Sequence, residues 1–214
     1  MSEFTANRLV TINVDVQNDF CPEGRLAVNE GDAVIPILNR LNRFTRDHNG
    51  IVIATGDQHP AVTPHFDTWP VHCVAGTKGA ELHKDLDIQA GDIIIDKGTG
   101  QTDGYSGFEG HAQDGQTIES IIRPREQEHV AVVIGGLATD YCVLSTTLDA
   151  LEIARQVRAE RQGKISVFAI RDAMRAVNIQ PDDGDEALRR MEQSGATIIH
   201  SFDILNNRAL GIIG

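Results

Sequence analysis

Short apolar runs rich in β-branched residues alternate along the chain with longer segments in which apolar residues recur at helical spacing. Apolar runs of about four to eight residues, without clean polar alternation, are typical of strands that are covered on both faces of a sheet. The sequence therefore predicts six strands, at residues 9–16, 51–55, 93–96, 130–135, 165–170 and 197–200. The helical spacing predicts four helices between them, at residues 33–48, 117–123, 139–161 and 182–194.

The alternation of these elements predicts the fold class. Strands that are joined through helices pair in parallel, and the right-handed crossovers place the helices against the sheet. We therefore expect an α/β fold with a doubly wound, mainly parallel six-stranded sheet and helices on both faces. The sequence contains no internal repeat and no linker-like change of composition, so residues 1–214 are expected to form a single domain.

Composition and charge narrow the classes of function. The 31 acidic and 19 basic residues give a net charge of −12, which argues against nucleic acid and anionic membranes as partners. The three cysteines do not suggest a disulfide framework and fit a reducing compartment. The start of the chain lacks the apolar stretch of a signal peptide, and the best apolar run is too short to cross a bilayer. We expect a cytoplasmic protein; the number of subunits stays open, with a homo-oligomer among the alternatives.

Reactive side chains follow four of the predicted strands. Asp15 ends the first strand, Asp57 and His59 follow the second, Lys97 ends the third, and Cys142 follows the fourth. In an open, doubly wound sheet, ligands bind beyond the carboxyl ends of the strands. Charged residues at strand ends are usually just solvated, so each signal alone is weak. Their convergence on one edge of the sheet predicts an active site.

Cys142 is the candidate nucleophile. It lies at the predicted start of a helix, three positions after Thr139, which is a candidate N-cap residue. A helix N-terminus favours the reactive thiolate, and its exposed N–H groups could hold a developing oxyanion. The alternative is that Cys142 is a buried structural cysteine, which is the commonest fate of a free thiol.

Asp15 and Lys97 form a predicted pair. Asp15 lies within an apolar strand, where a carboxylate is costly unless it is paired or hydrogen-bonded. Lys97, at the end of a neighbouring strand, is the natural partner. The alternatives are a structural ion pair and a catalytic one, in which Asp15 takes the Cys142 proton while Lys97 fixes the local charge balance.

A cluster of imidazoles and a carboxylate predicts a metal site. Asp57, His59, His65 and His72 lie within sixteen residues in a stretch without periodicity. One carboxylate and two or three imidazoles suit a divalent transition metal, with zinc preferred and iron(II) or manganese(II) as alternatives. Aromatic residues near the same edge suit a flat ring ligand: Phe20, Trp69 and Tyr105.

Six motifs resemble the nicotinamidase (pyrazinamidase) family of the isochorismatase-like cysteine hydrolases: VDVQNDFC at 14–21, TGDQH at 55–59, WPVHCVAGTKG at 69–79, DKG at 96–98, YSGFEG at 105–110 and GLATDYCV at 136–143. They are specific in combination, and with the order of the later elements the resemblance covers nearly the whole chain. It implies the isochorismatase-like fold for the predicted α/β domain.

The resemblance also implies roles for individual residues. It implies a catalytic triad of Asp15, Lys97 and Cys142, and an oxyanion hole formed by the N–H groups of Ala138 and Cys142 beside a cis Leu137–Ala138 bond. Further positions match metal ligands or ring contacts: Asp57, His59 and His72 as ligands, His65 as a fourth ligand found in some members only, and Phe20, Trp69 and Tyr105 as ring contacts. Tyr141 is counted with the substrate contacts, although some relatives have histidine there.

The implied activity is hydrolysis of nicotinamide, and of pyrazinamide, to the acid and ammonia through a cysteine thioester, in NAD salvage. Another amidohydrolase of this superfamily, acting on a carbamoyl or ureido compound, would keep the triad but need not keep the metal ligands. Isochorismatase itself is disfavoured because it lacks a nucleophilic cysteine at the position of Cys142. A non-catalytic metal- or ligand-binding module is the alternative from a different class.

Overall fold

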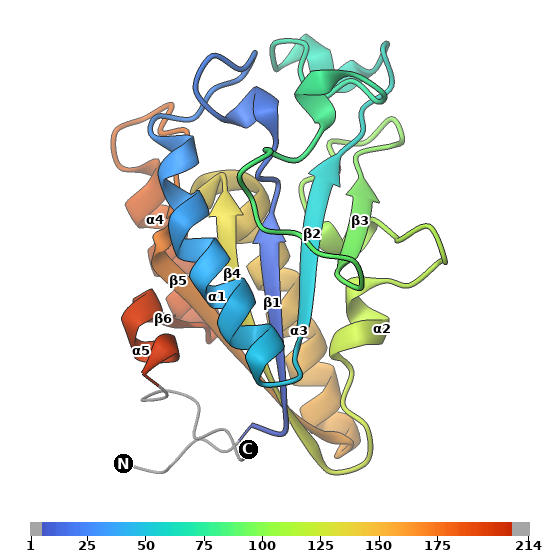
Figure 1. Cartoon of the computed structure of the whole chain (residues 1–214), viewed down its shortest axis with the longest axis vertical. Helices are drawn as coiled ribbons and strands as arrows, with labels where there is room; N and C mark the ends of the chain where they lie inside the picture. Colours follow the sequence, from blue (N-terminus) through green and yellow to red (C-terminus); the bar gives the residue numbers. More distant parts are fainter. Residues whose placement is uncertain (1–5, 207–214) are drawn as a thin grey trace.

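The computed structural model describes residues 6–206, which form one six-stranded sheet with helices on both faces (Figure 1). All the strand pairs are parallel, and the strand order is β3-β2-β1-β4-β5-β6. The strands are β1 (Arg8–Val14), β2 (Ile51–Asp57), β3 (Ile93–Lys97), β4 (Glu128–Leu137), β5 (Gly163–Arg175) and β6 (Thr197–Ile199). The predicted fold class is confirmed, and the order reverses between β1 and β4, which is where such folds bind ligands.

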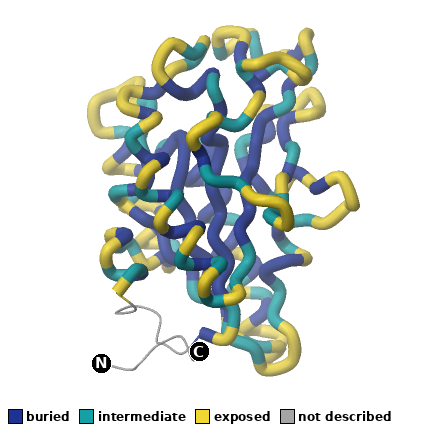
Figure 2. Tube along the Cα trace, in the orientation of Figure 1, coloured by how far each residue is buried: buried dark blue, intermediate teal, exposed yellow. Residues whose placement is uncertain are grey.

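The helices divide between the two faces of the sheet. One face is covered by α1 (Ile35–Asp47) and α5 (Ser201–Leu205), and the other by α2 (Ile118–Ile122), α3 (Leu144–Glu160) and α4 (Asp183–Ser194). Figure 1 shows α1 in front of the sheet and α3 behind it. Alternate residues of β4 pack into the two cores, because successive side chains of a strand point to opposite faces. Figure 2 shows the resulting buried strands and the largely exposed loops.

The observed elements differ from the predicted ones mainly at their ends. The predicted helix at 139–161 begins with a wider π-type turn, Thr139–Val143, before α3 starts at Leu144. Strand β5 continues to Arg175, and α5 was not predicted. Short 3-10 turns occur in the loops, at Asn18–Phe20, Gly31–Val34, Pro64–Asp67, Lys78–Ala80 and Gly107–Glu109. These turns are too short to leave a periodic signal in the sequence.

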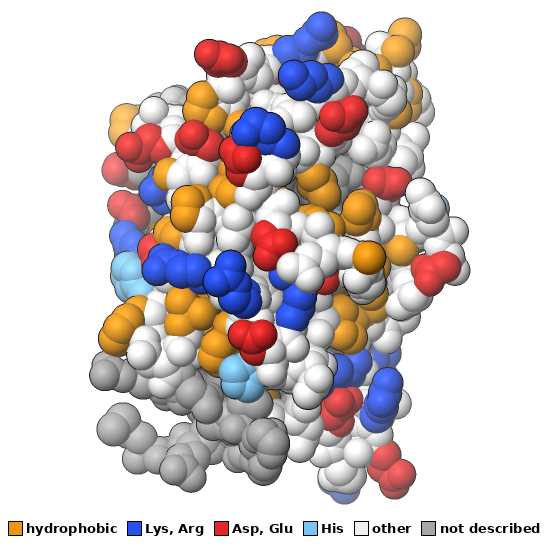
Figure 3. Space-filling view, viewed as in Figure 1, with side chains coloured by type: hydrophobic (Ala, Val, Ile, Leu, Met, Phe, Trp, Pro, Cys, Tyr) orange, Lys and Arg blue, Asp and Glu red, His pale blue; other side chains and the backbone are white. Residues whose placement is uncertain are grey.

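Acidic and basic side chains are interspersed on the face that carries α1 (Figure 3). Arg46 of α1, for example, pairs with Asp87 and Asp92 from the loop that precedes β3. Within residues 6–206, none of the helices has both the length and the apolar character needed to cross a bilayer.

Strand register brings the carboxyl ends of β1 to β4 together. Asp57 of β2 lies opposite Lys97 of β3, and Val14 of β1 lies opposite Gly136 of β4. Gly136 has a φ of 129°, and a Cβ atom there would lie 2.1 Å from the carbonyl oxygen of Val14. Glycine is therefore required where β4 passes β1, directly before the segment that carries Cys142.

Candidate active site

Lys97 is the centre of a buried polar cluster at the carboxyl ends of the strands. Its Nζ atom lies 2.9 Å from Asp15 Oδ2 and 2.6 Å from Asp57 Oδ1, and it donates to the Gly104 carbonyl at 2.9 Å. The same ammonium lies 3.6 Å from the Sγ atom of Cys142. The side chains of Asp15 and Lys97 are fully buried. The structure thus brings together the three residues of the predicted triad.

The charges in this cluster control one another's protonation. Burial alone would lower the pKa of Lys97, but Asp15 and Asp57 raise this pKa well above its usual value. Burial would raise the pKa of Asp57, but Lys97 and His59 lower it to about 2. For Asp15, the effect of burial is larger than the opposing effect of Lys97, so the pKa of this carboxyl is raised. Asp15 is therefore a stronger base than an exposed aspartate.

The end of β1 holds the Asp15 carboxylate in place. Asp15 has a φ of 48°, a left-handed conformation that aspartate tolerates better than most residues. Thr55 of β2 donates its hydroxyl to Asp15 Oδ1 at 2.6 Å, and its backbone carbonyl accepts from the N–H of Asp15. These bonds fix Asp15 against β2 and leave Oδ2 toward Lys97.

The position of Cys142 corrects two expectations from the sequence. Ala138, not Thr139, occupies the N-cap position of the turn, and this cap has no side-chain hydrogen bond. The predicted preference for the thiolate is also wrong for the resting protein. Burial raises the pKa of the Cys142 thiol well above its usual value, Lys97 opposes this, and Asp15 and Asp57 raise it further. Attack by this sulfur therefore requires a base, and a carboxylate oxygen of Asp15 lies within 4.8 Å of it.

The backbone before Cys142 has the expected unusual geometry. The Leu137–Ala138 peptide bond is cis, as the resemblance implied. Ala138 and Cys142 both line one pocket. We therefore still predict that the N–H groups of Ala138 and Cys142 donate to an oxyanion formed in this pocket.

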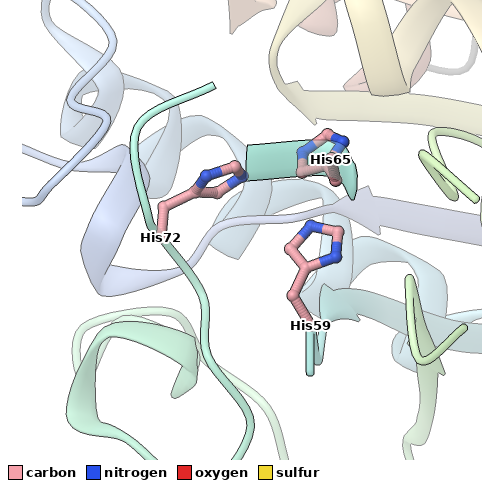
Figure 4. A group of neighbouring side chains, drawn as sticks. All are labelled: His59, His65 and His72. Atoms are coloured by element: carbon pink, nitrogen blue, oxygen red, sulfur yellow. The ribbon is translucent and has the colours of Figure 1, made fainter. Parts of the chain in front are cut away.

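Three buried histidines gather beside the cluster, with their rings turned toward one another (Figure 4). One ligand nitrogen from each of His59, His65 and His72 lies within 4.8 Å of the other two. In each ring, Nδ1 is hydrogen-bonded to an oxygen that can only accept. This oxygen is the Gly98 carbonyl for His59 at 3.0 Å, the Pro70 carbonyl for His72 at 2.7 Å and the Asp103 carboxylate for His65 at 2.8 Å. In the neutral form of each ring, Nδ1 therefore carries the proton and Nε2 offers a lone pair.

This donor set fits a divalent transition metal. Buried His59 Nε2 has no hydrogen-bond partner among residues 6–206, which is costly unless something binds it. Burial lowers the pKa of His72, which favours the neutral ligand form. Asp57 Oδ2 lies 3.6 Å from His59 Nε2, so this carboxylate can serve Lys97 through one oxygen and a metal through the other. The residues predicted as ligands thus lie together, His65 included.

One pocket reaches both the thiol and the histidines. It is lined by Cys142 and Asp57, by His65 and His72, and by all four predicted substrate contacts: Phe20, Trp69, Tyr105 and Tyr141. The Trp69 indole N–H donates to the Tyr105 hydroxyl at 3.0 Å, and the Trp69 and Tyr141 rings meet edge to face. Leu26 and Val177 complete the apolar wall. Sequence reasoning missed these two because an isolated aliphatic residue in a loop carries no distinctive signal.

Gln17 is a further residue that the sequence analysis missed. Its buried side chain donates to the Asp57 and Ala80 carbonyls at 2.8 and 2.7 Å and accepts from the Asp57 N–H at 2.8 Å. The amide therefore holds the backbone of Asp57 from both sides. A polar residue directly after an apolar strand was the available signal, but its partners are about 40 and 60 residues away in the sequence.

We expect Gln17→Glu to lower the free energy of unfolding by about 3 kcal/mol or more, because carboxylate oxygens would then face two carbonyl oxygens in a buried site. Urea denaturation followed by circular dichroism measures the change. Asn18→Asp is the matched control, since Asn18 makes one exposed bond to the Lys78 carbonyl, and it should cost less than about 1 kcal/mol. Equal effects of the two variants would contradict a special role for Gln17.

Comparisons with known proteins agree with this geometry. The isochorismatase domain model matches residues 9–203. The nicotinamidase of Escherichia coli K12 is 36% identical over 206 residues, which cover 86% of this chain and 91% of that protein. The nicotinamidase/pyrazinamidase of Mycobacterium tuberculosis H37Rv is 36% identical over 181 residues, covering 79% and 95%.

A solved structure shares the fold and much of the sequence. The pyrazinamidase of Pyrococcus horikoshii, in complex with zinc, superposes with a TM-score of 0.74 at 34% identity and covers 90% of this chain and 99% of its own. Domain match, relatives and fold agree over nearly the whole described chain. The chain belongs to the isochorismatase family.

Proposed function

We propose that this protein is a nicotinamidase, which hydrolyses nicotinamide, and also pyrazinamide, to the carboxylic acid and ammonia. One observation carries the proposal: a single pocket is lined both by Cys142, which carries the thiol, and by His65 and His72, which belong to the histidine cluster suited to a metal. A carboxamide attached to a nitrogen-containing ring presents two groups that match the thiol and the metal site. Release of nicotinate and ammonia would place the enzyme in NAD salvage.

In the first half of the reaction, Asp15 accepts the thiol proton of Cys142 as the sulfur attacks the carboxamide carbon. The new C–S bond turns the carbonyl oxygen into an oxyanion, to which the N–H groups of Ala138 and Cys142 donate. The raised pKa of Asp15 suits this task, because a carboxyl that is easily protonated is an effective base.

In the second half, Asp15 returns the proton. It protonates the leaving nitrogen as the C–N bond breaks, so that ammonia departs and a thioester remains on Cys142. Asp15 then takes a proton from water, which attacks the thioester carbon. As the C–S bond breaks, Asp15 returns this proton to the departing sulfur, so that the acid is released and the Cys142 thiol is restored. Lys97 stays an ammonium throughout, between Asp15 and Asp57, and limits the accumulation of negative charge in the buried cluster.

The pocket orients the substrate for this attack. We propose that Asp57, His59, His72 and His65 hold one divalent metal ion, with zinc preferred. Such an ion would supply a Lewis-acidic position for the ring nitrogen. Phe20, Trp69, Tyr105 and Tyr141 would contact the faces and edges of the ring. This assigns recognition of the ring to one side of the pocket and amide chemistry to the other.

We also propose a single domain and a cytoplasmic location. All three cysteines are free and buried, which suits a reducing compartment. A homo-oligomer stays an alternative to the monomer.

Ammonia release from nicotinamide tests the function, measured with the protein as purified, after treatment with EDTA, and after addition of zinc, iron(II) or manganese(II). We expect turnover that falls at least about tenfold on chelation and returns with metal, because the metal orients the ring. Hydrolysis of a carbamoyl or ureido compound instead of nicotinamide, insensitive to EDTA, would favour the other amidohydrolase. Absence of ammonia from every amide would favour a binding module.

A further inference from the structure

The loop of residues 98–104, between β3 and Tyr105, is closed at its base by two glycines. Gly98 and Gly104 have φ values of 63° and 64°, and a Cβ atom on Gly104 would lie 2.5 Å from the Gly98 Cα. A Cβ atom on Gly98 would lie 2.7 Å from the ring of His59. Only glycines permit this left-handed backbone and close contact together, so these two positions determine where the loop begins and ends.

Three polar contacts tie this loop to the functional side chains. The Gly98 carbonyl accepts from His59 Nδ1 at 3.0 Å, and the Gly104 carbonyl accepts from Lys97 Nζ at 2.9 Å. From within the loop, Asp103 Oδ1 accepts from His65 Nδ1 at 2.8 Å. A single short segment therefore contacts two of the candidate metal ligands and the buried lysine.

The contact of Asp103 with His65 differs in kind from the other two histidine contacts. His59 and His72 are held by backbone carbonyls, whereas His65 is held by a carboxylate. The side chain of His65 is 3% exposed and that of Asp103 is 54% exposed, so the imidazole is buried while its partner reaches in from the surface. A carboxylate on the outer nitrogen fixes the tautomer and makes the inner nitrogen a stronger donor.

The backbone around His65 gives this contact particular importance. His65 lies in the single 3-10 turn Pro64–Asp67, which is capped by Thr63. Its neighbour in the cluster, His59, lies two residues after the end of β2, and the ring centroids of the two stacked imidazoles are 4.4 Å apart. An imidazole carried by one short turn depends on its side-chain contacts for orientation more than one that continues a strand.

We propose that Asp103 is a positioning residue that orients His65 and thereby makes it the fourth metal ligand of this chain. The inference rests on the metal site of the proposed function. Asp103 acts through the imidazole and does not line the pocket that reaches Cys142. The loop of residues 98–104 then links occupation of the metal site to the position of Lys97, since both depend on the same seven residues.

The test is a metal-binding measurement that does not depend on turnover. The Kd for zinc is measured by competition with a chromophoric chelator for the wild type, Asp103→Asn, Asp103→Ala, His65→Ala and the double variant His65→Ala/Asp103→Asn. We expect each Asp103 variant to raise the Kd at least about tenfold. In the His65→Ala background, Asp103→Asn should change the Kd less than about twofold, because its only route to the metal is gone.

Asp67→Asn is the matched control. Asp67 is an exposed aspartate two residues from His65 in the same turn. Its replacement removes the same charge without the contact, so the Kd should stay within about threefold of the wild type. Thermal melting of the metal-free proteins identifies any variant that fails to fold. Asp103→Ala provides the second variant in case the amide of Asp103→Asn keeps a hydrogen bond to His65.

Other outcomes would overturn the inference. An unchanged Kd in both Asp103 variants, or an equal loss in the His65→Ala background, would show that Asp103 does not act through His65. The proposed function is judged separately by ammonia release and by His59→Ala. If His59→Ala lost zinc while the Asp103 variants bound it as the wild type does, the proposed metal site would be supported and only the role of Asp103 would be contradicted.

Discussion

Replacing Cys142 with alanine should lower kcat for nicotinamide by at least about 10⁴-fold, to the limit of detection. The sulfur forms the bond to the carboxamide carbon, and among the described residues Cys142 is the only thiol that lines this pocket. Asp15 and Lys97 stay in place, so folding and binding of the ligand should be preserved. Ammonia release measures the first effect, and calorimetric titration with nicotinamide measures the second.

Cys21→Ala is the matched control for this experiment. Cys21 is also a buried free thiol, and burial and Asp32 raise its pKa to about 11, but it lies outside the pocket that contains Cys142. Its replacement should leave kcat within about threefold of the wild type, with a small loss of stability from the lost packing. Substantial turnover by Cys142→Ala would show that this sulfur is not the nucleophile and that the thioester mechanism is wrong.

The sequence predicted those parts of the site whose position follows from the sheet. Asp15, Asp57 and Lys97 lie at the ends of parallel strands, so once the strands were assigned, their convergence followed from topology. His59 and Cys142 lie within a few residues of strand ends and were predicted for the same reason. The uninterrupted apolar runs made the strands recognisable, because a strand that is buried on both faces of a sheet needs apolar side chains on both faces.

The remaining features depend on contacts between distant segments. Gln17 meets Asp57 and Ala80, and Asp103 meets His65, through loops whose paths no periodicity indicates. The state of Cys142 was predicted wrongly because the helix N-terminus was considered without its surroundings. Burial and two neighbouring carboxylates outweigh the Lys97 ammonium and the local backbone, and these are properties of the folded cluster.

Benzamide should be a poor substrate, with a kcat/KM at least about a hundredfold below that of nicotinamide for the metal-loaded protein. It has the same carboxamide and nearly the same shape, but no ring nitrogen. The pocket walls formed by Phe20, Leu26 and Val177 are apolar and cannot tell the two rings apart, whereas the side formed by His65, His72 and Asp57 can. Without a nitrogen to bind there, the ring loses its alignment with the Cys142 sulfur.

His59→Ala tests whether this discrimination comes from the metal. It should lower the bound metal, measured by plasma mass spectrometry, and reduce the ratio of kcat/KM between the two amides to less than about tenfold, because nicotinamide loses its advantage while benzamide loses little. His111 is an exposed histidine outside the cluster, so His111→Ala should keep both the bound metal and the ratio of kcat/KM.

If the wild type turned over both amides equally, the histidine cluster would not recognise the ring nitrogen. The alternative of an amidohydrolase for a carbamoyl or ureido compound would then gain support. If the ratio survived in metal-depleted His59→Ala, recognition would come from the aromatic walls, and the metal would instead have a structural role in holding His59, His65 and His72 together.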